Sequence, residues 1–76
     1  MHGWARPLRG GDVALGLVNL GGGRADAEVG LAALFGEGAA AASALDVWTG
    51  THGRVEGRVA ASLAAHEATL LRLTPA

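Results

Sequence analysis

Acidic residues come first among the side chains that could do chemistry, because two carboxylates that face each other can cleave a glycosidic bond. Asp46 and Glu56 lie on neighbouring predicted elements, so a pairing between them is conceivable. Acids at exposed strand or turn positions are, however, usually solvated rather than catalytic. The sequence therefore assigns no catalytic residue, and we expect this chain not to be an enzyme by itself.

The other side chains of catalytic type are scattered along the chain. A zinc site needs three or four converging ligands, but His2, His52 and His66 have neither a helical nor a ribbon spacing, and there is no cysteine to join them. Ser43 and Ser62 have no neighbouring base that could activate a hydroxyl as a nucleophile. We therefore expect no metal ion and no cofactor.

Two glycine-rich stretches have a superficial likeness to phosphate-binding loops. Residues 36–41, GEGAAA, match a loose dinucleotide pattern, which also requires a preceding strand, a following helix and an acid about 20 residues later. Asp46 follows much sooner than that, so we take the match as chance in a chain with thirteen glycines. Residues 21–23, three glycines, lack the lysine and the helix of a phosphate loop and are expected to form a hairpin turn.

Trp4 and Trp48 are the side chains that could bind a ligand by stacking. An exposed tryptophan on a β-sandwich face can stack on a sugar ring, whereas a buried one adds apolar area to the core. Phe35 is the only other aromatic residue, so a small core has few other large side chains to replace either indole. We expect Trp48, in the stretch ALDVWTG, to be packed. Sugar binding by Trp48 or Trp4 is the alternative.

Length and composition limit the class of protein. Seventy-six residues form a single small domain, and without cysteine its stability must come from apolar packing. A net charge of −1, with six arginines dispersed among the acids and no basic stripe, argues against binding to nucleic acid. The apolar runs are too short to span a membrane, and the first residues have no signal-peptide pattern. The localisation stays unknown.

Alternation of apolar and polar residues predicts β-strands. Val13, Leu15 and Leu17 share one face of a strand that ends in three glycines. In residues 24–29, alanine and valine alternate with charged side chains. Residues 55–65 also fit a period of two better than a helical period, because the charges all fall on one parity.

The remaining segments complete an all-β pattern. WARPL, at residues 4–8, is expected to be an edge or initial strand because Pro7 has no amide donor. The glycines at 21–23 predict an antiparallel hairpin between the strands that flank them. The segment 31–44 is interpreted as a loop, and one helical turn around Leu31–Phe35 is the alternative. Two further short strands are expected, at residues 44–48 and 67–75. Many short strands without alternating helices predict an antiparallel β-sandwich.

Three sequence blocks occur in order along the chain: WARPLRGGDVALGLVNLG, LDVWTG and VAASLAAHEATLLRLTP. Together they resemble the C-terminal β-sandwich domain of the melibiase-like α-galactosidases of glycoside hydrolase family 27. In that family a W-A-K/R-P-L strand precedes a strand ending in F-N-R, a D-L-W-T/S-G turn and a last strand H-x-x-x-L-L-R-L. The resemblance covers residues 4–75. Val18 stands where the family usually has phenylalanine, Leu20 replaces its arginine, and residues 36–44 are rich in alanine.

The resemblance implies a fold, a partner and a role. The fold is an antiparallel sandwich with Greek-key connections, here without the short first strand that family members have before the tryptophan-containing strand. The partner is a (β/α)8 catalytic barrel, whose two aspartates hydrolyse terminal α-linked galactose and match no position of this sequence. The implied function is that of a non-catalytic accessory domain, residues 1–76, which packs against the barrel of an α-galactosidase-like glycoside hydrolase.

Two other functions stay open at this stage. One is a small carbohydrate-binding module that uses Trp4 or Trp48 as its platform. The other is an orphan β domain that forms a homodimer through the sheet edge left open by the missing strand.

Overall fold

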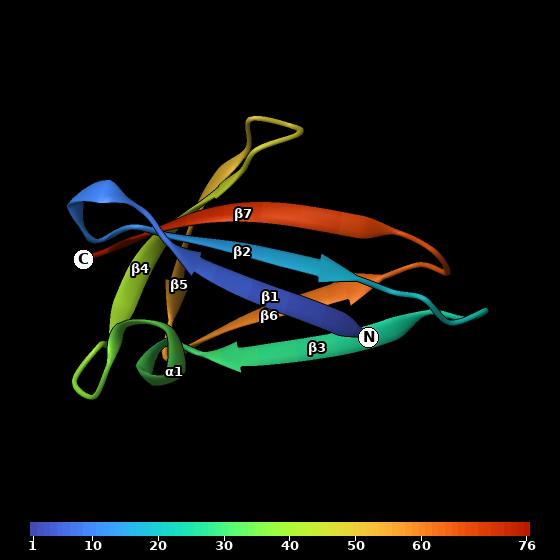
Figure 1. The fold of residues 1–76 in the computed structure, drawn as a ribbon, viewed down its shortest axis with the longest axis horizontal. Helices are drawn as coiled ribbons and strands as arrows, with labels where there is room; N and C mark the ends of the chain where they lie inside the picture. Colours follow the sequence, from blue (N-terminus) through green and yellow to red (C-terminus); the bar gives the residue numbers. More distant parts are fainter.

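The computed structural model describes all residues, 1–76, and contains seven β-strands and one short α-helix (Figure 1). A 3-10 turn at Arg9–Gly11 joins the first two strands. In chain order the elements are β1 (His2–Pro7), β2 (Val13–Val18), β3 (Ala25–Gly30), α1 (Leu31–Phe35), β4 (Ala41–Asp46), β5 (His52–Glu56), β6 (Arg58–Leu63) and β7 (Ala68–Pro75).

The strands form two antiparallel sheets that pack as a sandwich. The larger sheet has the strand order β1-β2-β7-β4-β5, and the smaller sheet consists of β3 and β6. In Figure 1, β7, β2 and β1 lie side by side above β6 and β3. Gly57, with a φ of +72°, lies at the point where the chain leaves β5 and enters β6 in the other sheet. The predicted all-β antiparallel sandwich is confirmed.

The core lies between the two sheets and follows the predicted alternation. Val13, Leu15 and Leu17 of β2 are buried, and Leu73 of β7 is fully buried beside them. The smaller sheet faces them with a corresponding pair of buried side chains, Val59 and Leu63 of β6. Side chains two residues apart on a strand share a face, and this is why the period-two pattern identified the core residues.

The predicted hairpin between residues 13–18 and 25–30 is wrong. β2 pairs with β1 and β7, whereas β3 pairs with β6 in the other sheet. The glycines at 21–23 therefore carry the chain from one sheet to the other. A glycine-rich link permits a tight turn but does not decide between a hairpin and a crossing. The side chain of Asn19 holds the crossing in place where it leaves β2.

Asn19 is the buried polar residue that connects the ends of the two sheets. The two N–H groups of its side-chain amide donate to three carbonyl oxygens, those of Gly23 (2.7 Å), Leu63 (3.1 Å) and Ala64 (3.1 Å), so that one N–H is shared. Its Oδ1 accepts a hydrogen bond from the backbone N–H of Gly21 at 3.0 Å. One side chain that is 1% exposed thus ties the end of β2 to the end of β6 and fixes the glycine-rich crossing between them.

The interpretation of the segment 31–44 as a loop is wrong, because it contains α1, the helical turn of the alternative, and the start of β4. Leu31 of α1 is completely buried, and Gly36, with a φ of +97°, follows the last residue of the helix. β4 begins at Ala41, and Ala42 is fully buried between the sheets. An alanine run shows no contrast between the two faces of a strand, so the alternation that revealed the other strands is invisible here.

No helix in the structure is long and apolar enough to cross a membrane.

β1 is an edge strand, as its proline predicted. It pairs with β2 on one side and has no neighbour on the other. Pro7 lies at the last position of β1, opposite Val13. The absence of a first family strand and the Greek-key connections stay predictions.

Replacement of Asn19 by alanine should lower the free energy of unfolding by about 2–3 kcal/mol, because it leaves buried carbonyl groups without a donor. Asn19→Asp should destabilise the fold at least as much, since the aspartate keeps the acceptor for Gly21 but offers the carbonyls no donor. Urea unfolding followed by circular dichroism measures both changes. Ser43→Ala, at an exposed strand position, is the control and should stay within about 0.5 kcal/mol of the parent chain. Equal stability of the Asn19 and Ser43 variants would contradict the assignment.

Candidate functional site

Trp48 sits in a turn that Asp46 organises. The Asp46 carboxylate accepts hydrogen bonds from the backbone N–H groups of Trp48 (3.0 Å) and Thr49 (3.2 Å). Gly50, with a φ of +75°, closes the turn by donating its N–H to the Asp46 carbonyl at 2.8 Å. Aspartate readily forms such turns because its short carboxylate reaches the amides that follow it. The carboxylate of Asp46 therefore fixes the backbone that carries Trp48.

The prediction that Trp48 is packed in the core is wrong. Its side chain is 62% exposed, and that of Trp4 is 54% exposed. β4 ends at Asp46, so Trp48 no longer follows the alternation of the strand. The turn instead places Trp48 beside the first residues of β7, at a point where β4 has already left the sheet. Two hollows meet at its indole ring.

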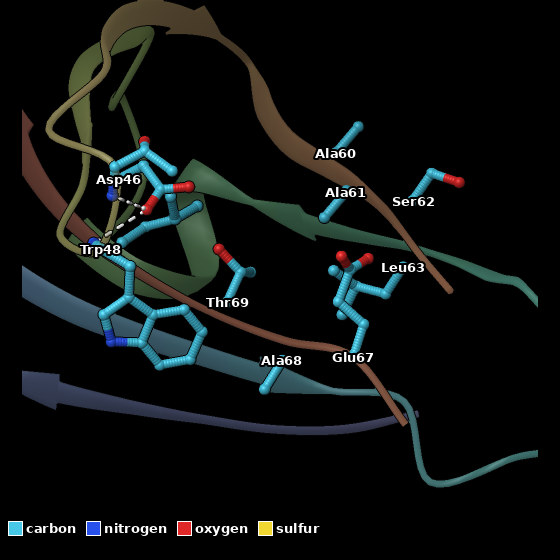
Figure 2. A pocket seen from close by; sticks show the side chains of 11 residues that line it. Asp46, Trp48, Ala60, Ala61, Ser62, Leu63, Glu67, Ala68 and Thr69 are labelled. Carbon is cyan, nitrogen blue, oxygen red and sulfur yellow. Dashed lines mark hydrogen bonds between the residues drawn. The ribbon is translucent and has the colours of Figure 1, made fainter. Parts of the chain in front are cut away.

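The first hollow, which we call the inter-sheet hollow, opens between β6 and β7 and has a volume of about 380 Å³. Figure 2 shows the Trp48 indole at one side of it, with Ser62 and Glu67 farther along. Five polar residues contribute to its lining: Asp46, Thr49, Ser62, Glu67 and Thr69. Hydroxyls and carboxylates beside an exposed indole are the side chains that can hydrogen-bond and stack a sugar.

The carboxylates of the inter-sheet hollow also hold the backbone. Oε1 of Glu67 accepts a hydrogen bond from the N–H of Ala64 at 2.9 Å, within the turn between β6 and β7. Asp46 holds the turn of Trp48 in the same manner. Sequence reasoning missed Glu67, because the fold that places it in the lining of the same hollow as Asp46 leaves no local signal in the sequence.

The second hollow, the outer hollow, lies between Trp4 and Trp48 on the outer face of the larger sheet and has a volume of about 220 Å³. The Trp4 indole covers Gly16 on the neighbouring strand, where an added Cβ would collide with the ring. Gly16 lies directly opposite Trp4 in the register of β1 and β2. Glycine at this position therefore lets the indole lie against the sheet backbone. The rest of the lining consists of Leu17, Val18, Ala68, Thr69 and Leu70.

The structure does not bring Asp46 and Glu56 together. The register of β4 and β5 places Glu56 opposite Ala41, whereas Leu45, next to Asp46, lies opposite His52. The two carboxylates thus lie at opposite ends of the strand pair. Glu56 forms an exposed ion pair with Arg54, at 3.2 Å between Oε1 and Nε.

The histidines and serines lie on separate elements. His2 is in β1, His52 in β5 and His66 in the turn between β6 and β7. No group of three or more histidine, cysteine, aspartate or glutamate side chains that could hold a metal ion occurs in the structure. Ser43 is exposed on β4, and the hydroxyl of Ser62 accepts a hydrogen bond from Arg24 at 3.2 Å.

The two glycine-rich stretches lie in connections. Residues 36–41 follow α1 and lead into β4, so no helix begins after the glycines as a dinucleotide site requires. Residues 21–23 form the crossing between the sheets that Asn19 holds.

A family model described as the alpha galactosidase C-terminal beta sandwich domain matches residues 1–73. No curated protein matches the chain. Among solved structures, a β-L-arabinopyranosidase of glycoside hydrolase family 27 from Geobacillus stearothermophilus is similar, with a TM-score of 0.86 and 25% identity. That likeness covers 97% of this chain and 17% of the other.

A second similar structure is α-galactosidase I from Mortierella vinacea, with a TM-score of 0.77 and 16% identity. It covers 95% of this chain and 21% of the other, and at this identity the likeness concerns the fold. The chain thus spans 17% and 21% of the length of these two proteins.

Proposed function

The chain belongs to the family of alpha galactosidase C-terminal β-sandwich domains, and we propose from this that it is a non-catalytic accessory domain of a glycoside hydrolase. Its role is to pack against a (β/α)8 catalytic barrel and to stabilise it. The observation that carries the proposal is the family match over residues 1–73. Further support comes from Asp46 and Glu67, whose carboxylates hold backbone amides.

The isolated chain should not hydrolyse 4-nitrophenyl α-galactoside or 4-nitrophenyl β-L-arabinopyranoside above the buffer rate. Glycoside hydrolysis needs two carboxylates that face each other across the bond, and Asp46 and Glu56 lie at opposite ends of a strand pair. A colorimetric assay at high protein concentration measures the rate. The Asp46→Asn chain, purified in parallel, is the control for contaminating glycosidase. Turnover in the parent chain that disappears in this variant would overturn the non-catalytic assignment.

Carbohydrate binding is a second candidate function, because Trp48 is 62% exposed at the rim of the polar inter-sheet hollow. In this alternative the indole stacks on a sugar ring, and Asp46, Ser62 and Glu67 accept or donate hydrogen bonds to its hydroxyls. Trp4 is the other possible platform, but the outer hollow beside it is mostly apolar.

If the accessory role is the whole function, tryptophan fluorescence should not change on addition of galactose, arabinose or galactomannan. Both indoles are exposed, so a sugar that stacked on either one would alter its emission. Titrations of Trp4→Phe and Trp48→Phe leave one reporter each and assign any change to one ring. A saturable change that survives in Trp4→Phe and is lost in Trp48→Phe would favour the carbohydrate-binding function.

Homodimer formation through an open sheet edge is the third candidate. β1 and β5 are the edge strands of the larger sheet. Proline and charged side chains on edges oppose strand addition, and these strands carry Pro7, Arg54 and Glu56. We therefore expect a monomer in sedimentation velocity over a concentration series. A sedimentation coefficient that rises with concentration to the value of a dimer would contradict this expectation.

A further inference from the structure

The large hydrophobic side chains that remain exposed lie on or beside the outer face of the larger sheet and beyond one end of β1 and β2. They are Met1, Trp4, Leu20, Val47 and Trp48, each at least 44% exposed. The register of β1 and β2 places His2 opposite Val18, so Met1 and Leu20 lie beyond the same end of this strand pair. A small soluble domain normally scatters its exposed apolar residues, and their clustering marks an interaction site.

The sheet register shows how this surface is built. Trp4 lies opposite Gly16, and Gly16 lies opposite Leu70 on β7. Val47 continues the row, since its N–H donates to the carbonyl of Leu70 at 3.0 Å. Residues directly opposite in paired strands share a face, so this row crosses the outer face of the larger sheet. The neighbouring row adds Val18 and Ala68. We call the side chains of Trp4, Val18, Val47, Trp48, Ala68 and Leu70 the outer apolar patch.

The other half of the same sheet face is polar. The next row contains Arg6 and Arg72, and Nε of Arg72 forms an ion pair with Oδ2 of Asp12 at 2.8 Å. Beyond it lie Thr74 and Ser43, which are paired with each other. The change from apolar to charged rows occurs within one face, so the exposed apolar half is a local feature of the surface. The smaller sheet also presents charges outward, including the pair Arg58 and Glu28.

The lining of the outer hollow indicates the chemistry of its occupant. No charged residue lies in the lining, and Thr69 is its one residue with a hydroxyl group. A sugar needs several hydrogen-bond partners, whereas an apolar protein surface needs indoles and aliphatic side chains that exclude water. The Trp4 indole already lies against the backbone at Gly16. Rigid aromatic side chains lose little conformational entropy on docking. The patch therefore suits a protein surface.

The position of the N-terminus indicates which protein surface contacts the outer apolar patch. In this family the sandwich is the C-terminal domain, and the chain spans 17% of the similar arabinopyranosidase. In an enzyme of this family the preceding domain connects on the N-terminal side of the sandwich, and β1 begins at His2, in the apolar rows of the face. A domain that arrives at this point lies next to the outer apolar patch.

We propose that the outer apolar patch is the surface that docks on an apolar face of the catalytic domain, with Trp4 and Trp48 as its anchors. This inference rests on the proposed accessory function and adds the face and the residues that make the contact. The polar half of the sheet and the smaller sheet stay in solvent.

Site-directed thiol labelling tests the docking face, because the chain contains no cysteine of its own. Residues 1–76 replace the C-terminal sandwich of the Geobacillus stearothermophilus arabinopyranosidase, and one position at a time is changed: Val47→Cys in the patch, Thr74→Cys on the polar half, and Ala60→Cys on the smaller sheet. All three positions are exposed in the structure. The labelling rate with a maleimide is measured by peptide mass spectrometry in the isolated chain and in the fusion.

The thiol at position 47 should react about tenfold more slowly in the fusion than in the isolated chain, because the core of an interface excludes solvent. The thiols at positions 74 and 60 should react at nearly equal rates in both. An active fusion in which position 47 is not protected overturns the docking face and leaves the proposed function intact. An inactive fusion overturns the proposed function and, with it, the inference. Protection of position 47 that rises with the concentration of the isolated chain assigns the patch to a second copy instead, which also overturns the inference.

Discussion

The hydrogen bonds of Asn19 are the constraint on which the sandwich depends. Two sheets that face each other need a link that fixes their relative position, and the core of this chain has few large side chains to provide it. The Asn19 amide supplies that link, since its two N–H groups reach three carbonyl groups and its oxygen accepts from one backbone amide, at the end of β6 and in the connections beside it. A fully satisfied buried polar group specifies one arrangement, because any other arrangement leaves it unpaired.

The small core also explains the division of the surface. The smaller sheet has two strands and covers only part of the five-stranded sheet, so the buried hydrophobic set is short. An isolated domain of this size buries a modest fraction of its apolar area. Apolar side chains on the outer face of β1, β2 and β7 contribute nothing to the internal core. Their presence there is better explained by a contact outside the chain than by the stability of the sandwich alone.

Part of this structure was predictable from the sequence, and the physical reasons for the errors are specific. The alternation on β2 and β6 located Val13, Leu15, Leu17, Val59 and Leu63 correctly, because burial on one face leaves a period of two. Pro7 correctly predicted that β1 is an edge strand of the larger sheet. The alanine run hid β4, since alanine fits either face. The glycines at 21–23 indicated a turn but not its partner strand, which depends on a contact 44 residues away, between Asn19 and Leu63.

The candidate site was the least predictable part, and Trp48 shows why. Its burial was argued from the scarcity of aromatic residues, which treats the domain as if it had to satisfy its own core. The structure instead ends β4 at Asp46 and uses the carboxylate to hold the indole outside the core. The LDVWTG stretch indicates the turn but not the exposure of the ring, because the end of β4 and the start of β7 meet only in the fold.

The place of Trp48 between two hollows links the competing functions to one side chain. Its indole borders the inter-sheet hollow, with hydroxyls and carboxylates, and the outer hollow, which is nearly all apolar. A sugar in the first hollow uses one part of the ring, and a protein surface over the second uses another. Because Trp4 lies in the outer hollow alone, docking there engages both indoles, whereas sugar binding between the sheets engages only Trp48. The burial of two aromatic anchors excludes more water than that of one, and for this reason the geometry favours the outer face as the main contact surface.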